Sequence, residues 1–231
     1  MLNCVTSQKK LCGQKNCKIC FNRSLSSYEG RTKNGKLKIE CWDIDKNNGI
    51  KPDDITMRAG HKKWFQCDIC NHHFETVIYA ITAEKCSWCP YCANKKLCGD
   101  KNCVDCFDKS IASFKEKTIN EKLKINCWSI QNKIEPRNVF SSSHKKYSFD
   151  CDICSHTFES TVYNIIKSQW CSYCTNKYLC NDDNCDMCYN NSFASYKGKT
   201  VNKKLKVDCW DNEKNGNVKP RDIFKTKNQK Y

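Results

Sequence analysis

The sequence has little apolar material with which to build one large hydrophobic core. Of its 231 residues, 39% are hydrophobic and 28% are charged. It contains no run of about 18 apolar residues that would cross a membrane, and its first ten residues include no apolar stretch of signal-peptide length. We therefore expect no membrane span and no secretion, and we expect small units held together by something other than apolar burial.

A catalytic constellation is also missing. A nucleophilic thiol needs a nearby base and a group that orients that base. The cysteines are instead grouped as metal ligands are, and a zinc ion held by four thiolates has no open position for water. The sequence therefore predicts a protein that is not an enzyme and that takes no small-molecule substrate.

Cysteine, by contrast, is abundant, with 22 residues. A chain without an export signal is expected in a reducing compartment, where thiols stay free for metal, and this favours zinc over disulfides. A disulfide scaffold remains the alternative, because cysteine-dense scaffolds occur among exported proteins. We expect the protein inside the cell, in the cytoplasm, the nucleus, a viral factory or a virion.

Three internal repeats organise the chain. The segment 11–17 returns as 97–103 and as 179–185, at offsets of 86 and 82 residues. We assign the repeats to residues 1–96, 97–178 and 179–231, the third being truncated. We expect the third repeat to cap the array, ordered around its own zinc, with a tail from Lys225 that is loosely held or paired with another copy. The alternative is a disordered remnant.

Each repeat shows the same local patterns. A serine-led segment such as 24–28 predicts a short helical turn. A strict alternation over 36–41 then predicts a strand with an apolar face and a lysine-bearing face, and segments 64–66 and 74–79 predict a hairpin. We expect the tryptophan after each alternating segment in a small core rather than as a base-stacking platform; these are Trp42, Trp128 and Trp210.

Two cysteine sets have the spacing of a four-cysteine zinc ribbon. Each combines two Cys-x-x-Cys turns, separated by 18 residues in the first repeat and by 16 in the second. Each turn supplies two ligands, and two turns complete the tetrahedral site that zinc prefers. The sets are Cys67, Cys70, Cys89 and Cys92, and Cys151, Cys154, Cys171 and Cys174.

Three further sets have gaps of four, two and twenty residues in all three repeats. They are Cys12, Cys17, Cys20 and Cys41; Cys98, Cys103, Cys106 and Cys127; and Cys180, Cys185, Cys188 and Cys209. The third repeat holds these four cysteines and no others, so a self-sufficient site there needs all four. An alternative grouping joins neighbouring clusters, for instance Cys89 and Cys92 with Cys103 and Cys106. Either way we expect about five zinc ions per chain, since four ligands complete each site.

Two cysteines and two histidines fall outside these sets. Cys4 and Cys86 have no matching positions in the other repeats, although a shifted pair of Cys86 with Cys89 is conceivable. His72 and His156 both lie two residues after the second cysteine of the first ribbon turn. Because the sets are already full, we expect these histidines to hydrogen-bond around the sites rather than to ligate zinc.

Several of these motifs resemble the probable zinc-ribbon repeat, a family common in large DNA viruses of protists. The resemblance is carried by Trp42, by segments 48–52 and 63–67, and by segments 72–74 and 88–92. It implies a small metal-stabilised α+β fold, a tandem array of Cys4 zinc-ribbon or treble-clef-like modules with short β-hairpins and short helices, and a role around nucleic acid. The cysteine before the first tryptophan is not a reliable part of that pattern, so its ligand role rests on this sequence alone.

Charge adds a functional expectation. The formal net charge is +15, and twenty thiolates with five Zn²⁺ ions would reduce it to +5. Lysines on the alternating segments and in two His-Lys-Lys triplets favour a non-sequence-specific nucleic-acid-binding module. The candidates are Lys36, Lys38, Lys62, Lys63, Lys122, Lys124, Lys145, Lys146, Lys204 and Lys206. The alternative is a structural or scaffolding protein, such as a virion component, whose zinc modules contact other proteins.

Overall fold

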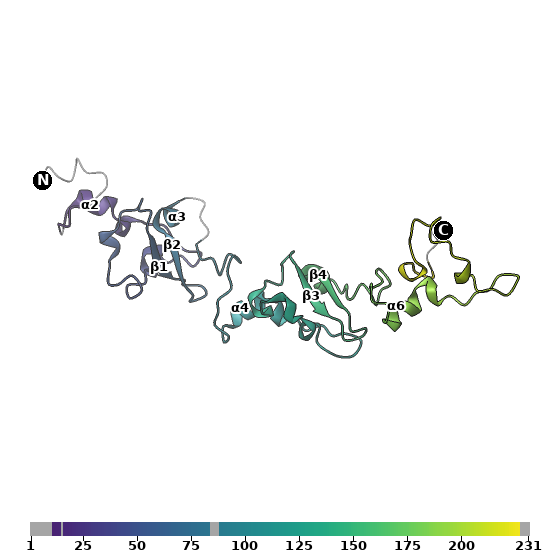
Figure 1. Cartoon of the computed structure of the whole chain (residues 1–231). Helices are drawn as coiled ribbons and strands as arrows, with labels where there is room; N and C mark the ends of the chain where they lie inside the picture. The colour runs from purple at the N-terminus through teal and green to yellow at the C-terminus, as the bar shows by residue number, and fades with distance from the viewer. Residues whose placement is uncertain (1–10, 15, 84–87, 227–231) are drawn as a thin grey trace. The chain divides into compact units, whose positions relative to one another are not determined.

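A computed structural model describes residues 11–14, 16–83 and 88–226 as short helices, 3₁₀ turns and two β-hairpins (Figure 1). The chain divides into two compact units, Met1–Cys106 and Phe107–Tyr231. The dividing point lies inside helix α4 (Val104–Lys109), whereas the three repeats assigned from the sequence stay a prediction. The expected fold class, a small metal-stabilised α+β array of tandem modules, is confirmed. Within the described residues, no helix is long and apolar enough to cross a membrane.

Within its described residues, the first unit contains two short helices and a hairpin before α4 begins. Its elements in chain order are α2 (Lys18–Arg23), η1 (Leu25–Ser27), η2 (Lys38–Cys41), η3 (Pro52–Asp54), β1 (Lys62–Gln66), β2 (His73–Val77) and α3 (Ile78–Thr82), where η marks a 3₁₀ turn. The predicted helical turn after Ser24 is therefore present as η1. Its serine does not cap it, since the Ser24 hydroxyl donates back to the Phe21 carbonyl at 2.8 Å.

The second unit repeats this order with one additional 3₁₀ turn, η6. After α4 come η4 (Ile111–Ser113), η5 (Lys124–Cys127), η6 (Ile130–Asn132), η7 (Pro136–Asn138), β3 (Lys146–Asp150), β4 (Thr157–Thr161) and α5 (Val162–Ile166). The third repeat then contributes α6 (Asp186–Asn191), η8 (Phe193–Ser195), η9 (Val207–Cys209) and η10 (Pro220–Asp222). Within its described part, residues 179–226, the third repeat has no hairpin. Its expected role as an ordered cap stays a prediction.

The two hairpins are antiparallel and share one register. Phe65 faces Phe74 across β1 and β2, and Phe149 faces Phe158 across β3 and β4. These four phenylalanines are buried. Alternation places them on one face of each hairpin, and that face builds the core of its module.

Tryptophans complete each small core. Trp42 meets the edge of Phe65 at 5.3 Å, and Trp128 meets Phe149 at the same distance. Trp88 makes a further edge contact with Phe74 at 5.1 Å. Such pairs each add about 0.5–1.5 kcal/mol beyond the area they bury. Trp42 and Trp128 therefore serve as core anchors, as expected.

The alternating segments do not form strands. They form the 3₁₀ turns η2, η5 and η9, in which positions three apart share a face and the period of two is lost. Lys38 is buried, and its Nζ donates to the Ile81 carbonyl at 3.0 Å while lying 5.8 Å from the Trp88 ring centre. Lys124 is also buried, with its Nζ 2.7 Å from Glu116 Oε2. The prediction that these two lysines face solvent is wrong, because carbonyl, carboxylate and aromatic partners hold their ammonium groups inside.

Candidate metal centres

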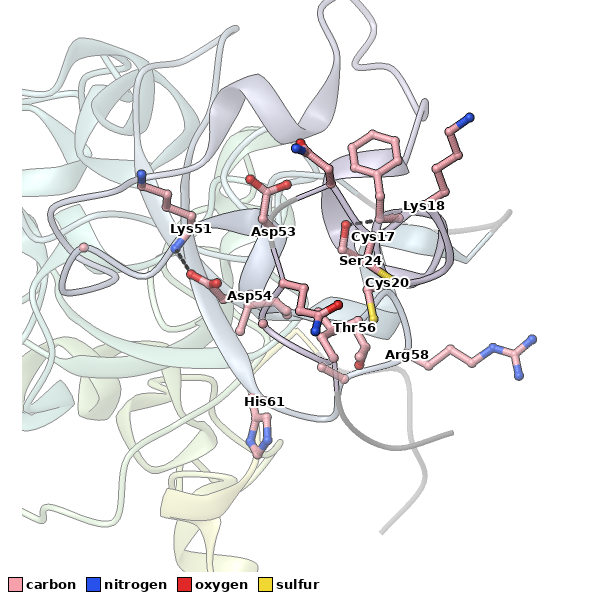
Figure 2. Close-up of a pocket in the computed structure, with 18 of the residues that line it drawn as sticks. Cys17, Lys18, Cys20, Ser24, Lys51, Asp53, Asp54, Thr56, Arg58 and His61 are labelled. Carbon is pink, nitrogen blue, oxygen red and sulfur yellow. Dashed lines mark hydrogen bonds between the residues drawn. The ribbon is translucent and has the colours of Figure 1, made fainter. Parts of the chain in front are cut away.

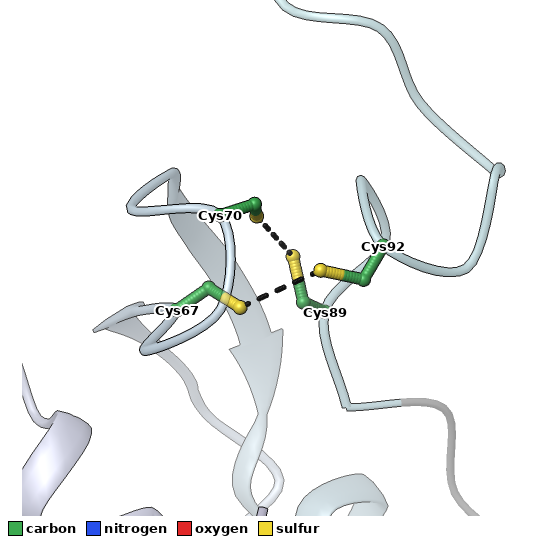
Figure 3. A group of neighbouring side chains, drawn as sticks. All are labelled: Cys67, Cys70, Cys89 and Cys92. Atoms are coloured by element: carbon green, nitrogen blue, oxygen red, sulfur yellow. Dashed lines mark hydrogen bonds between the residues drawn. The ribbon is translucent and has the colours of Figure 1, made fainter. Parts of the chain in front are cut away.

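The first ribbon group is built by two turns that face each other. Cys67 and Cys70 lie between β1 and β2, and Cys89 and Cys92 lie in a turn after α3 (Figure 3). The Sγ atoms of Cys67 and Cys92 are 3.7 Å apart, and those of Cys70 and Cys89 are 3.6 Å apart. Four sulfurs at about 2.3 Å from a zinc ion would stand about 3.8 Å apart. The group therefore fits a tetrahedral zinc ion.

The backbone of each turn explains how this geometry arises. The amide of Cys67 donates to the His72 carbonyl at 2.9 Å, and the amide of Asn71 donates to the Cys67 carbonyl at 2.9 Å. Asn71 has a φ of 56°, a left-handed conformation that asparagine tolerates better than most residues. The turn thus closes in a shape that directs both thiols to the same side.

The second ribbon pairs its cysteines in the same way and at similar distances. The Sγ atoms of Cys151 and Cys174 are 3.6 Å apart, and those of Cys154 and Cys171 are 3.5 Å apart. Burial raises the pKa of Cys171 to about 12, as it does for Cys89. Such thiols give up their protons to a cation, so zinc binding here releases protons.

A second kind of group joins a ribbon histidine to three cysteines of the following repeat. His72 Nε2 lies 3.3 Å from Cys103 Sγ and 3.5 Å from Cys106 Sγ, and Cys98 belongs to the same group. Nitrogen and sulfur ligands of one tetrahedral zinc ion would stand about 3.5 Å apart. This Cys₃His set therefore also fits zinc.

The second Cys₃His group has the same form. His156 Nε2 lies 3.4 Å from Cys185 Sγ and 3.5 Å from Cys188 Sγ, with Cys180 as the fourth member. Each histidine ring stacks on the tyrosine of the ribbon's second turn, with 4.2 Å between the rings of His156 and Tyr173 and 4.2 Å between those of His72 and Tyr91. The tyrosines hold the imidazoles in the orientation that directs Nε2 at the thiols.

The fifth group consists of Cys12, Cys17 and Cys20. The Sγ atoms of Cys12 and Cys20 are 3.3 Å apart, and the Cys12 amide donates to Cys20 Sγ at 3.2 Å. A hollow of about 1710 Å³ lies beside this group, between Cys17 and Cys20 and the acidic residues of η3 (Figure 2). Cys4 and Cys86, left over in the sequence, lie outside the described residues.

Two segments of the chain, 39–95 and 125–177, match the family model of a probable treble clef zinc finger domain. Both segments therefore resemble treble clef zinc fingers. Each matched segment contains one complete four-cysteine set and one ribbon histidine, whereas the three-cysteine clusters lie outside it. The resemblance drawn from the sequence is thereby confirmed.

A viral protein is similar in sequence to this chain. An uncharacterized protein of Acanthamoeba polyphaga mimivirus is 36% identical over 163 residues. The matched region covers 69% of this chain and 35% of the mimivirus protein, so the chain spans about a third of the length of that relative.

The observed grouping corrects the ligand sets predicted for the clusters between zinc fingers. Among the described residues, Cys41, Cys127 and Cys209 belong to none of the groups, and His72 and His156 hold the places predicted for Cys127 and Cys209. The alternative that joins Cys89 and Cys92 to Cys103 and Cys106 is not present either among the described residues. A search for four ligands within one repeat does not find the histidines, because the cysteines that they join belong to the next repeat. Their matching positions are the signal that would reveal them.

The five groups support about five zinc ions per chain, as expected. When bound, each ion cross-links its module, and a structural zinc ion contributes on the order of 10 kcal/mol to folding. The seventeen cysteines of the groups as thiolates, with five Zn²⁺ ions, bring the formal charge from +15 to +8.

One cation lies against a cysteine of the second Cys₃His group. Arg221, in η10, places Nη2 3.8 Å from Cys180 Sγ and donates to the Asp182 carbonyl at 2.8 Å. A guanidinium in this position offsets negative charge on a thiolate. The first repeat has Asp53 at the matching position, after Pro52.

The lysines predicted to contact nucleic acid fall into a buried group and an exposed group. Lys38 and Lys124 are buried and Lys63 is half-buried. The exposed candidates are Lys36, Lys62, Lys122, Lys145, Lys146, Lys204 and Lys206. Exposed cations therefore remain in each repeat, and two of them, Lys62 and Lys146, begin β1 and β3.

Proposed function

We propose that this chain binds the phosphate backbone of nucleic acids without sequence preference. The observation that carries the proposal is a cationic loop that recurs in all three repeats, at residues 31–36, 117–122 and 199–204, here called the basic loops. Their exposed cations are Arg31, Lys33, Lys36, Lys117, Lys122, Lys199, Lys203 and Lys204. Lysine and arginine gathered on such loops suit a backbone that carries one charge per nucleotide.

Each basic loop is closed by the same bond. The amides of Thr32, Thr118 and Thr200 donate to the carbonyls four residues later, each at 2.8 Å. In the first repeat, the Thr32 hydroxyl also donates to Asp68 Oδ2 of the ribbon turn at 2.6 Å. A loop held in one conformation loses little entropy on binding, which favours affinity.

The overall charge supports the same function. With zinc bound, the chain keeps a formal charge of +8, which steers polyanions toward it. Four of the zinc groups supply four protein ligands each, so we also propose that these ions are structural and that the protein is not an enzyme. A reducing compartment suits their thiolates.

Protein scaffolding is the second candidate function, and apolar loop tips favour it. Ile119 and Val201 stand at the tips of two basic loops and are 85% and 100% exposed. Ile130 is 93% exposed on the same module as Ile119. Apolar side chains so placed suit contact with another protein.

A salt titration tests the nucleic-acid proposal. Binding of the zinc-loaded chain to duplex and single-stranded DNA and RNA is measured by fluorescence anisotropy at several salt concentrations. Replacing Lys33, Lys36, Lys203 and Lys204 by alanine should weaken binding roughly tenfold or more. On duplex DNA it should also flatten the salt slope by about 0.9 for each phosphate that the variant no longer neutralises.

The matched control replaces four exposed lysines outside the basic loops, namely Lys51, Lys101, Lys177 and Lys219. It removes the same charge, so a loop-specific interface predicts a clearly smaller loss of affinity. Equal losses would attribute binding to net charge alone. Absence of binding at low salt would favour scaffolding, which the triple variant of Ile119, Ile130 and Val201 to serine then tests by co-purification.

A further inference from the structure

In the first two repeats, the ribbon hairpin covers a face made by the basic loop, the 3₁₀ turn and the segment after the tryptophan. Asn132 holds the hairpin in the second repeat: its Nδ2 donates to the Ser148 carbonyl and its Oδ1 accepts from the Ser148 amide, both at 2.8 Å. Asn47 holds Trp64 in the same way, at 2.8 and 3.0 Å. One asparagine thus satisfies both backbone groups of a strand residue in each module.

The basic loop forms hydrogen bonds with the first Cys-x-x-Cys turn of the ribbon. Thr118 Oγ1 donates to Asp152 Oδ2 at 2.5 Å, and Asn120 Nδ2 donates to the Asp152 carbonyl at 3.0 Å. Thr32 and Asn34 make the matching contacts to Asp68, at 2.6 and 3.4 Å. The aspartate is the second residue of each Cys-Asp-Ile-Cys ribbon turn. The face therefore recognises a specific chemical feature of a ribbon.

The third repeat keeps the recognition residues. Thr200 and Asn202 occupy the loop positions, and Asn215 follows Trp210 by five residues, as Asn47 follows Trp42. Asn215 also lines a hollow of about 450 Å³, together with Phe193, Lys206 and Cys209. Asn215 thus borders an open hollow, and Thr200 and Asn202 belong to the basic loop of the same repeat.

Matched residues that are buried in the first two repeats and exposed in the third show which part of the face a hairpin covers. Cys41 and Cys127 are 4% and 2% exposed in the first two repeats, whereas Cys209 is exposed. Lys38 and Lys124 are buried, whereas Lys206 is exposed. The residues that change are those that face the ribbon half of a complete module.

We propose that this face of the third repeat receives the β-hairpin of a zinc ribbon supplied from outside these 231 residues. The hairpin would offer a backbone amide and carbonyl to Asn215 and an aspartate-bearing ribbon turn to Thr200 and Asn202. Its apolar face would fill the hollow and bury Cys209. The partner is thus defined as a treble clef ribbon of the kind seen twice in this chain.

The probe is a synthetic, zinc-loaded peptide of residues 146–178, which holds β3, β4 and one complete four-cysteine set. It is titrated onto the full zinc-loaded chain, and alkylation of Cys209 by iodoacetamide is followed by mass spectrometry. Docking should slow the modification of Cys209 at least tenfold. The chain variant Thr200→Ala with Asn215→Ala should lose this protection.

A second protein covers the case in which the peptide does not fold. Residues 148–178 are appended after Tyr231, the counterpart of Tyr147, which gives the third repeat a ribbon in register. The proposal expects one additional zinc ion and protected Cys209. An added zinc ion with Cys209 as reactive as before overturns it. So does a rise in Cys209 reactivity on deleting residues 227–231, which would show that the chain's own end covers this face.

Discussion

The two kinds of zinc group use similar ligands, but the first takes them from one repeat and the second takes them from two successive repeats. The four-cysteine groups draw both Cys-x-x-Cys turns from one ribbon, so their zinc completes a single treble clef. The Cys₃His groups take a histidine from that ribbon and three cysteines from the repeat that follows. The first kind therefore builds a module, and the second ties the module to the start of the next repeat.

Removing a ribbon ligand should have the largest effect. Cys70→Ser should lose one zinc ion, counted by native mass spectrometry. The β1–β2 hairpin should then lose hydrogen-exchange protection, because a zinc ion worth on the order of 10 kcal/mol outweighs the small core. A hairpin that stays protected from exchange without its zinc would mean that the aromatic core alone keeps it folded.

Removing the shared histidine should have a narrower effect. His72→Ala should lose the zinc ion at Cys98, Cys103 and Cys106 or weaken its binding at least tenfold, since three thiolates remain for a site that needs four ligands. Hydrogen exchange should rise over residues 98–109 while β1 and β2 stay protected. Loss of protection in both regions would show that the two sites fold as one unit.

The matched control for this variant is Cys127→Ser, at the position that the cysteine spacing predicts for the same site. Cys127 is buried outside the zinc group, so the zinc count should stay unchanged. A hydroxyl in place of the buried thiol should cost about 1–3 kcal/mol of unfolding free energy. A zinc ion missing from this variant would restore the ligand role that the spacing predicts for Cys127.

The two kinds of site should also differ in proton release. Burial opposes ionisation of Cys98, but hydrogen bonds from His72 and from the Asp100 backbone outweigh it and lower its pKa to about 7. Burial instead raises the pKa of Cys89 to about 12. In the folded site, the Cys98 thiol therefore gives up its proton more readily than the Cys89 thiol.

Zinc affinity should therefore fall with falling pH at both sites, and more steeply at the ribbon. Calorimetric titrations of zinc into the metal-free protein, in buffers of different ionisation enthalpy, count the protons released at each site. Variants Cys70→Ser and His72→Ala separate the two contributions. Equal proton counts would remove this distinction between the sites.

The smallest expected effect concerns the cation beside Cys180. Arg221→Gln keeps a polar side chain and removes the positive charge near the thiolate, so zinc should leave this site a few-fold faster, consistent with the roughly 0.2–1 kcal/mol of an ion pair near the surface. Competition with a chromogenic chelator measures the rate. The matching change at Asp53, to asparagine, should leave zinc loss from the Cys12 group unchanged.

Short-range patterns were readable from the sequence. The spacing of Cys-x-x-Cys turns located both ribbon groups, because each turn brings two thiols together within four residues. The hairpins followed from β-rich segments on either side of the first turn. The end of the chain was less predictable: Lys225, expected to begin a loose tail, donates from Nζ to the Asn190 carbonyl at 2.7 Å, and residues 227–231 lie outside the described part.

The sequence by itself determined the repeat, the zinc chemistry and the ribbon ligands, since these depend on contacts between residues close along the chain. Only the tertiary structure decided that His72 and His156 join the zinc groups and that Cys127 and Cys209 do not, because the three cysteines of one repeat meet a ribbon folded more than twenty residues earlier. Likewise Lys38 is buried because Ile81 and Trp88, some forty to fifty residues later, surround its ammonium group. The alternation of apolar and polar residues within a segment does not indicate which distant residues will pack against it.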